Sequence, residues 1–259
     1  MKRNVIIVLL SMLCIAVSAQ NVVDKNNMKQ GKWVKFDDDG NKVYEGTFKN
    51  DKPVGEFLRF FDNGKLRSRQ IFNPDNTVET ELFRPEGKLV AKGIFVGTKK
   101  EGEWIYYSTK GEVFFREFFK NGERHGTSTL YDEKGRIFET IDWQNGKMHG
   151  AHRQFFPDGK LQSEVNYEEG MREGLSQSFF DNGKIEATGS FVNNKKEGIW
   201  TFNNVDGSLD FEIEYKDGEP VNREELDRQL QQQLDENDRN AGMRDPADYM
   251  SRPEEFIYR

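Results

Sequence analysis

The sequence has few of the residues from which most globular cores and catalytic sites are built. Hydrophobic residues make up 35% of the 259 residues, against roughly 45–50% in a typical soluble domain, and there are one cysteine and three histidines. This shortage excludes a disulfide framework and argues against the thick core of common enzyme scaffolds. Aromatic residues still reach 13%, with 21 Phe and 24 Gly, whereas disordered chains are poor in aromatics. We therefore expect a folded chain without a large aliphatic core.

The first nineteen residues have the pattern of a secretory signal peptide. Lys2 and Arg3 precede an apolar run over residues 5–17, and small residues follow up to Ala19, so we expect residues 1–19 to be cleaved off. The alternative is a membrane anchor, but the run is shorter than the ~20 apolar residues that a spanning helix needs. The sequence thus predicts an exported protein that is periplasmic, associated with the outer membrane or extracellular.

Cleavage would also change the chemistry of the chain. It removes the only cysteine, Cys14, which lies inside the apolar stretch behind Leu13, where lipid attachment is not expected. It also removes two basic residues, so the net charge moves from −7 to about −9. Such an acidic balance disfavours contacts with phosphate backbones and anionic lipid. We expect no nucleic-acid partner and no transmembrane segment after signal cleavage.

An internal repeat organises most of the chain. Glycine recurs at intervals of 24 residues, with a single interval of 23 around residues 73–76. Seven of the eight units carry a second, opening glycine nine residues upstream, and the third unit has Val78 there. Eight units therefore cover residues 31–222, after a lead-in over residues 20–30. The turn glycines are Gly40, Gly64, Gly87, Gly111, Gly135, Gly159, Gly183 and Gly207, and the opening glycines are Gly31, Gly55, Gly102, Gly126, Gly150, Gly174 and Gly198.

Each unit has the pattern of a β-hairpin. The first strand runs from the opening glycine towards a turn in which a polar residue precedes the turn glycine, a pair that supplies positive φ. The second strand ends in an aromatic residue eight positions past that glycine, and a second turn such as Asn121-Gly122 leads into the next unit. In seven units the second strand also carries an aliphatic residue six positions before that aromatic, and on a strand of period two these two side chains share one face. The expected ladder is Phe48, Phe72, Phe95, Phe119, Trp143, Tyr167, Phe191 and Tyr215.

Identical hairpins in tandem predict an all-β fold, an elongated single-layer antiparallel meander of about eight units. Sixteen strands at ~4.8 Å give a twisted ribbon roughly 75 Å long. Equivalent side chains of successive units would form columns two strands apart, and aromatic pairs between strands contribute on the order of 0.2–1 kcal/mol each. Stability would then be a sum over neighbouring units.

The pattern changes after the repeats. Leu226, Leu230 and Leu234 recur every four residues and predict a short α-helix over residues 223–239. Its expected role is to cover the open edge of the last hairpin, and the alternative is a partner-binding helix.

The tail over residues 240–259 contains a small duplication. Pro, an acid two residues later, an aromatic and an aliphatic residue recur at a spacing of seven, with Tyr249 in the first copy and Phe256 in the second. The tail is either an unstructured end or a docking peptide that folds on a partner or on its own ribbon. In the second interpretation Tyr249 and Phe256 are the docking residues.

The repeat resembles the MORN-variant repeat family over about three quarters of the chain. The resemblance rests on Gly31-Lys32-Trp33, Gly102-Glu103-Trp104-Ile105-Tyr106-Tyr107 and Asn145-Gly146-Lys147. The sequence departs from the family pattern in the third unit, and also at Ser128, His152 and Ser176, where tryptophan is expected. The resemblance implies a hairpin-repeat scaffold or binding surface without catalytic residues. Similar bacterial arrays are labelled antitoxin-like, of the YwqK type, and that label fits poorly with export, because an antitoxin neutralises its toxin in the cytoplasm.

The sequence contains no motif for nucleophilic catalysis, phosphate binding or metal ligation. His125 and His149 occupy the same repeat position, so they would lie ~10 Å apart, too far to share one metal. We interpret them as a solvated polar column, and the alternative is a weak surface metal site. The sequence therefore predicts no enzymatic activity, no catalytic residue, no metal and no cofactor.

The expected function is that of an exported, non-enzymatic scaffold that binds a protein partner in the cell envelope or outside the cell. Packing of the sheet accounts for most of the row of aromatic side chains. The alternative is that the row forms a binding surface for a protein or a glycan. The alternatives are a toxin-neutralising, immunity-type protein and a carbohydrate-active enzyme.

Overall fold

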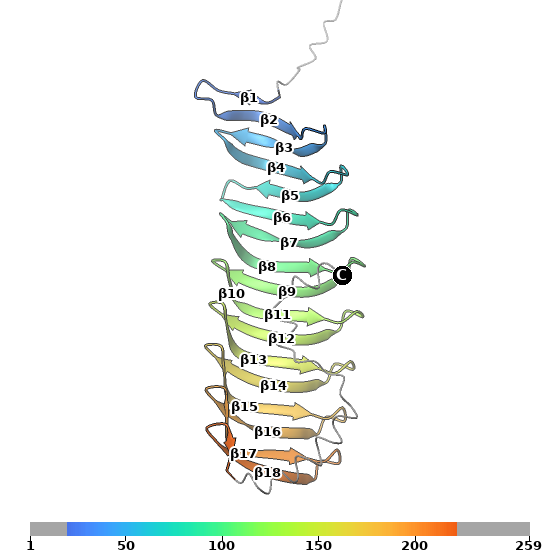
Figure 1. Cartoon of the computed structure of the whole chain (residues 1–259), viewed down its shortest axis with the longest axis vertical. Coiled ribbons are helices and arrows are strands. Elements are labelled where there is room, and N and C mark those ends of the chain that lie inside the picture. Colours follow the sequence, from blue (N-terminus) through green and yellow to red (C-terminus); the bar gives the residue numbers. More distant parts are fainter. Residues whose placement is uncertain (1–19, 222–259) are drawn as a thin grey trace, which may run out of the picture.

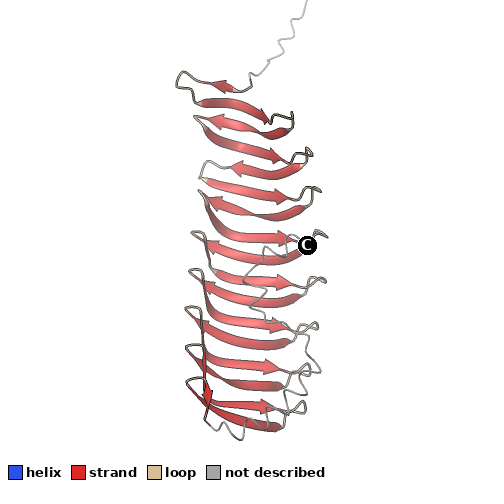
Figure 2. Cartoon of the chain, in the orientation of Figure 1, coloured by secondary structure: helices blue, strands red, loops and turns tan. Residues whose placement is uncertain are grey.

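The structure is a computed structural model that describes residues 20–221, and in this range the protein is a single antiparallel β-sheet. Strands that follow one another in the sequence are paired, except that β10 and β11 both pair with β9, which makes one open meander. Figures 1 and 2 show an elongated ribbon, one layer thick, built of strands alone. The predicted all-β meander is confirmed. The predicted signal peptide, the helix over residues 223–239 and the tail with Tyr249 and Phe256 lie outside the described residues.

The sheet has nineteen strands, three of which are only two residues long: β1 (Val22–Val23), β10 (Glu123–Arg124) and β19 (Glu219–Pro220). The other sixteen form the eight hairpins of the repeat. These are β2 (Lys29–Phe36), β3 (Lys42–Lys49), β4 (Lys52–Phe60), β5 (Leu66–Phe72), β6 (Thr77–Phe83), β7 (Leu89–Val96), β8 (Lys99–Tyr107), β9 (Val113–Lys120), β11 (Gly126–Tyr131), β12 (Ile137–Gln144), β13 (Lys147–Phe155), β14 (Leu161–Glu168), β15 (Met171–Phe179), β16 (Ile185–Val192), β17 (Lys195–Asn203) and β18 (Leu209–Lys216).

Two kinds of turn lie on opposite long edges of the ribbon (Figure 1). Within a unit, the turn glycine adopts a φ between 74° and 91°, and its N–H donates back across the turn, as from Gly64 to the Phe61 carbonyl at 2.8 Å. Between most units the turn has two residues of positive φ, such as Asn50 at 51° and Asp51 at 65°. That is the turn whose twist matches paired strands.

The opening glycines lie inside strands, at bulges. Their φ lies between 65° and 106°, a region that residues with a Cβ rarely adopt. In the second unit Gly46 pairs with Phe57 but Thr47 pairs with Val54, so Gly55 and Glu56 bulge out of the ladder. In six units the first strand therefore begins two or three residues before the opening glycine, and not at the glycine as the sequence suggested. In the fifth unit the short β10 lies there, and β11 begins at Gly126 itself.

The third unit shows why one interval is 23 residues. A longer turn over residues 73–76 precedes it, in which the N–H of Asn73 donates to the Thr77 carbonyl at 2.9 Å and Asn76 has a φ of 66°. The register from Phe72–Val78 onwards continues without a shift. Because this unit lacks the bulge, its side chains keep the same faces as those of its neighbours despite the missing residue.

Strand alternation divides the side chains between two faces. The aromatic face, as we call it, carries the ladder residues, all four tryptophans and most of the buried apolar side chains, among them Phe57, Trp104, Ile141, Phe191, Trp200 and Ile213. The opposite, acidic face carries exposed ion pairs. The position two residues after the opening glycine, here the Trp position, lies at the centre of the aromatic face: Trp33, Phe57, Thr80, Trp104, Ser128, His152, Ser176 and Trp200.

Large and small side chains are matched between neighbouring units on this face. Where the Trp position holds a large ring, glycine lies beside it on the preceding strand: a Cβ at Gly46, Gly93 or Gly189 would come within 2.2–2.4 Å of the ring of Phe57, Trp104 or Trp200. Where that position holds Thr80, His152 or Ser176, the neighbour is larger: Gln70, Ile141 and Val165. The departures from tryptophan are thus compensated by the adjacent strand.

Candidate binding face

Ring contacts on the aromatic face join the ladder to the Trp position. The Phe48 ring centroid lies 6.1 Å from that of Trp33 and 5.6 Å from that of Phe57, and Phe57 is 6.1 Å from Phe72. Successive ladder residues lie two strands apart, ~9.6 Å, beyond the range of ring contact. The structure therefore connects the predicted ladder residues through the residues of the intervening strand.

Basic side chains lie over these rings. They come from the position two residues before the opening glycine: Lys29, Lys100, Arg124, Arg172 and Lys196. The Lys100 Nζ lies 4.6 Å from the ring centroids of both Trp104 and Phe119, and the Lys196 Nζ lies 4.3 Å from Trp200. Burial lowers the pKa of both lysines. These contacts have the geometry of cation–π interactions.

At the C-terminal end of the face two cations are close together. The Arg172 guanidinium carbon lies 4.3 Å from the Phe191 ring centroid, and Phe191 packs at 5.1 Å against Trp200, which lies under Lys196. The charge of Arg172 adds to burial in lowering the pKa of Lys196. Among the described residues no carboxylate forms an ion pair with either cation.

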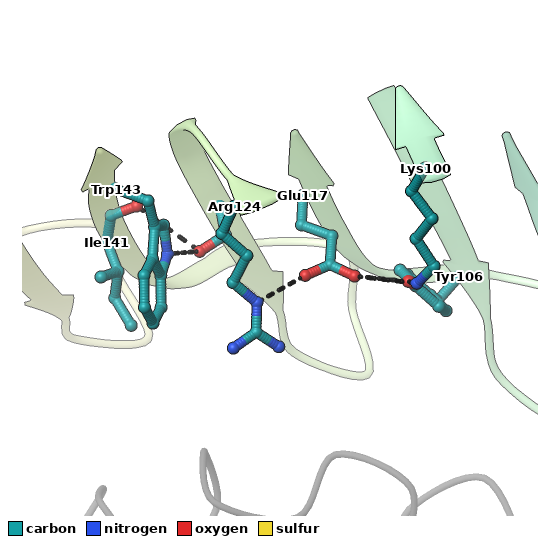
Figure 3. Close-up of polar contacts among 7 residues, drawn as sticks. Lys100, Tyr106, Glu117, Arg124, Ile141 and Trp143 are labelled. Atoms are coloured by element: carbon teal, nitrogen blue, oxygen red, sulfur yellow. Dashed lines mark hydrogen bonds and ion pairs between the residues drawn. The ribbon is translucent and has the colours of Figure 1, made fainter. Parts of the chain in front are cut away.

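In the middle of the face a buried carboxylate joins two cations (Figure 3). Glu117, with a side chain only 4% exposed, accepts a hydrogen bond from the Tyr106 hydroxyl and one from Arg124 Nε at 2.9 Å, and Lys100 Nζ lies 3.7 Å away. Lys100 also donates to the Tyr106 oxygen at 2.7 Å. Burial, and then the charge of Glu117, raise the pKa of Tyr106, so this phenol is a donor at neutral pH.

A second buried carboxylate follows in the next unit. His152 Nε2 lies 2.7 Å from Glu139 Oε1, to which Gln154 Nε2 also donates at 3.2 Å. Neither Glu117 nor Glu139 stands out in the sequence, because both are hidden among 45 acidic residues. For Glu117 a signal existed, since the equivalent position in the other units holds glycine, an aliphatic residue or, in the second unit, the uncharged Gln70.

Charge is segregated between the two faces. Among the described strands, alternation places only Glu117 and Glu139 of the carboxylates on the aromatic face. On the acidic face three arginines are paired with carboxylates: Arg69 Nε lies 2.7 Å from Glu56, Arg116 lies 3.0 Å from Glu103 and Arg153 lies 2.6 Å from Glu164. A chain with a net charge of −7 thus presents a positively charged aromatic face.

The histidines do not assemble a metal site within residues 20–221, where no group of three or more His, Cys, Asp or Glu side chains is placed to hold an ion. His149 Nδ1 lies 3.9 Å from Glu169 Oε1, and His125 Nδ1 is buried without a hydrogen-bond partner in that range. The same residues include no helix with the length and apolarity to span a membrane.

Comparison with known proteins gives one family. The MORN repeat variant matches residues 29–50, 53–73, 148–169 and 172–193, which are the first, second, sixth and seventh units. No curated protein matches the sequence.

Two solved structures are similar in part. One is TarM of S. aureus in complex with fondaparinux, alpha-GlcNAc-glycerol and UDP, with 12% identity over 46% of this chain and 21% of that chain, at a TM-score of 0.25. The other is accessory secretory protein 1,2 and 3 of Streptococcus pneumoniae, with 17% identity over 43% and 19% of the two chains, at a TM-score of 0.23. The matched region spans about a fifth of each of those chains.

Proposed function

Because the chain carries MORN repeat variants, we propose that it is an exported, non-enzymatic repeat scaffold that binds a protein partner through its aromatic face. The observation that carries the proposal is the row of cations over the rings of Trp33, Trp104 and Trp200, on one side of a sheet that is a single layer over residues 20–221. Aromatic and arginine side chains dominate the energetics of protein interfaces. The fitting partner presents carboxylates beside apolar groups.

Repetition supports this function. A scaffold of stacked units offers an extended surface in which each unit contributes the same kind of contact. Several weak contacts in a row then act together, because each further contact is intramolecular once the first has formed. The five basic positions on the face recur with the repeat, so a partner with regularly spaced acidic groups can engage more than one of them.

Affinity capture from envelope fractions tests the face. The bait is the full chain, and the face variant carries Lys29→Gln with Lys100→Gln. The matched control carries Arg69→Gln with Arg116→Gln, which removes the same charge from the acidic face. We expect the wild-type and control baits to retain the same protein and the face variant to lose it. Equal retention by all three, with equal circular dichroism, would contradict binding through the aromatic face.

Export has its own test. Fractionation of cells that make the full chain, followed by N-terminal sequencing, should find a product that begins at Gln20 outside the cytoplasm. A full-length product confined to the cytoplasm would contradict export and would favour the toxin-neutralising alternative.

In the capture experiment, retention of a glycan in place of a protein would show that the ligand of the aromatic face is a glycan.

A further inference from the structure

The C-terminal end of the aromatic face combines a ring platform with two cations that form no ion pair within residues 20–221, where the Arg172 side chain donates only to the Asn194 carbonyl, at 3.3 Å. Lys196 Nζ lies 4.3 Å from the ring centroid of Trp200 and 4.8 Å from that of Tyr215, and Arg172 covers Phe191. The corresponding cations in the middle of the face, Lys100 and Arg124, share the carboxylate of Glu117. Arg172 and Lys196 have no such partner among the described residues.

The chemistry of this place defines its ligand. Two cations over rings are partly desolvated, so an incoming carboxylate gains more there than beside a fully hydrated lysine. The rings around them add contact area for an aromatic or aliphatic side chain. The matching ligand is a peptide in which an acidic residue directly precedes an aromatic one.

The chain itself contains two such sequences. Asp248-Tyr249 and Glu255-Phe256 each place an acid directly before an aromatic residue, and Met250 and Ile257 follow them. They belong to the duplication at a spacing of seven residues. The stretch from residue 222 to 259 holds ten acidic and six basic residues, so its net charge is opposite to that of the aromatic face.

The C-terminal segment is tethered beside this end of the face, because the chain leaves the sheet there, after Val221. The N–H of Val221 donates to the Glu214 carbonyl of β18 at 2.8 Å, and β18 is the neighbour of β17, which carries Lys196. Val221 and Asp245 are 24 positions apart in the sequence, a span of at most about 80 Å when extended, so length does not limit access. Closing a short loop is entropically cheaper than closing a long one, and a tethered segment acts at a millimolar effective concentration.

We propose that the Arg172–Lys196 end of the aromatic face binds an acidic–aromatic peptide and that its occupant is the chain's own C-terminal segment, through Asp248-Tyr249 and Glu255-Phe256. The segment covers the rings and neutralises the two cations. It also competes with any outside ligand of the same chemistry at this end of the face. The inference rests on the charges and rings of the face, so it can hold whether or not the proposed partner exists.

The four tryptophans provide a direct test in the full chain, because all of them lie on the aromatic face. Cys14 is the only cysteine, so a Cys14→Ser chain with Ser251→Cys takes a bimane label at one place in the tail. Tryptophan quenches bimane only at short range. We expect the emission of the folded labelled chain to be at most half of that in concentrated urea, with no dependence on protein concentration.

Two variants locate the contact. Arg172→Gln with Lys196→Gln should restore most of the emission, as should Trp200→Phe, which removes the quencher. The matched control, Arg69→Gln with Arg153→Gln, removes equal charge from the acidic face and should leave the quenching unchanged. A synthetic peptide of residues 241–259 should compete with the tethered segment and raise the emission.

Three results would overturn the inference. One is emission that does not differ between folded and unfolded chains. Another is quenching that survives in the Arg172–Lys196 variant while circular dichroism shows it folded. The third is quenching that grows with protein concentration, which would assign the occupant to a second copy. None of these readouts involves the partner, so failure here is distinguishable from failure of the capture experiment.

Discussion

The indole of Trp200 lies so close to Gly189 that a Cβ at Gly189 would stand 2.2 Å from the ring. The backbone of Gly189 does not have positive φ, so contact with the ring, and not conformational freedom, requires the glycine. The same relationship joins Gly93 to Trp104 and Gly46 to Phe57. Each of these three rings thus depends on the absence of a side chain on the adjacent strand.

Gly189→Ala should therefore destabilise the last two units. Overpacking of this kind typically costs about 1–3 kcal/mol. The variant should unfold at lower urea concentration, and hydrogen exchange should locate the loss to β16 and β17. The double variant Gly189→Val with Trp200→Ser, which imitates the natural pair Val165–Ser176, should be more stable than Gly189→Val alone. Equal stability of those two would contradict the size matching.

The bulge glycines make a different prediction. Gly174 has a φ of 77°, and a Cβ there would meet nothing within 4 Å, so Gly174→Ala suffers from the backbone alone, by about 1–2 kcal/mol. Gly174→Asn should lose less, since Asn tolerates this region. Urea unfolding of the two variants checks the order. If alanine were as stable as asparagine, the positive φ would not be the reason for the glycine.

Removal of the charge at Glu117 should be felt more than removal of an exposed carboxylate. Glu117→Gln removes the buried carboxylate that Arg124 and Lys100 share. We expect it to lower the free energy of unfolding by about 1–3 kcal/mol. The control Glu103→Gln breaks the ion pair with Arg116. The Arg116 side chain is 40% exposed and that of Glu103 is 35% exposed, so this change should cost no more than about 1 kcal/mol. The two urea midpoints provide the comparison, and the reverse order would argue against a structural role for Glu117.

Acid should weaken the ribbon through its turns. Hydrogen bonds from the Arg136 side chain and backbone lower the pKa of Asp132 from 3.8 to about 2, and turn hydrogen bonds lower the pKa of Asp37, Asp75, Asp158 and Asp206. The unfolded chain binds more protons in this range, so stability falls as pH falls. The contribution of Asp132 is complete above pH 3.8 and is lost as pH falls through about 2.

The urea midpoint, measured from neutral pH downwards, should therefore begin to drop near the unfolded pKa of aspartate. In Asp132→Asn, which cannot titrate there, the drop should be shallower, and the midpoint above pH 3.8 should be lower than in the wild type. Identical profiles for the two chains would show that this turn carries no acid sensitivity.

The hairpins and their turns could be predicted from the sequence, whereas the bulges and the matching of large and small side chains could not. Turn glycines such as Gly64 and the pairs such as Asn121-Gly122 act locally, so a fixed spacing was enough to place turns and strands. The bulge at Gly55 depends on how two strands pair across it, and one sequence does not distinguish a glycine in a bulge from one in a turn. The sequence shows that Gly93 is small and Trp104 is large. Only the register of β7 and β8 shows that the two residues are neighbours.

The candidate face was foreseen in part. The aromatic ladder follows from alternation along the strands, whereas the cations over it do not. Lys100 and Lys196 were hidden because their repeat position is shared with Pro53 and Met148, which break the pattern. Their contacts with the rings of Trp104 and Trp200 are visible only in the folded sheet.

The even length of the unit has a consequence for how such a chain can change over generations. Insertion or loss of one whole unit alters the ribbon by two strand spacings, about 9.6 Å, and returns every following side chain to its original side. The bulge-free third unit shows that even an odd length is accommodated when the turn changes with it. The length of the ribbon can therefore change in steps of one repeat unit, while the side chains of the aromatic face and of the acidic face stay on their own sides.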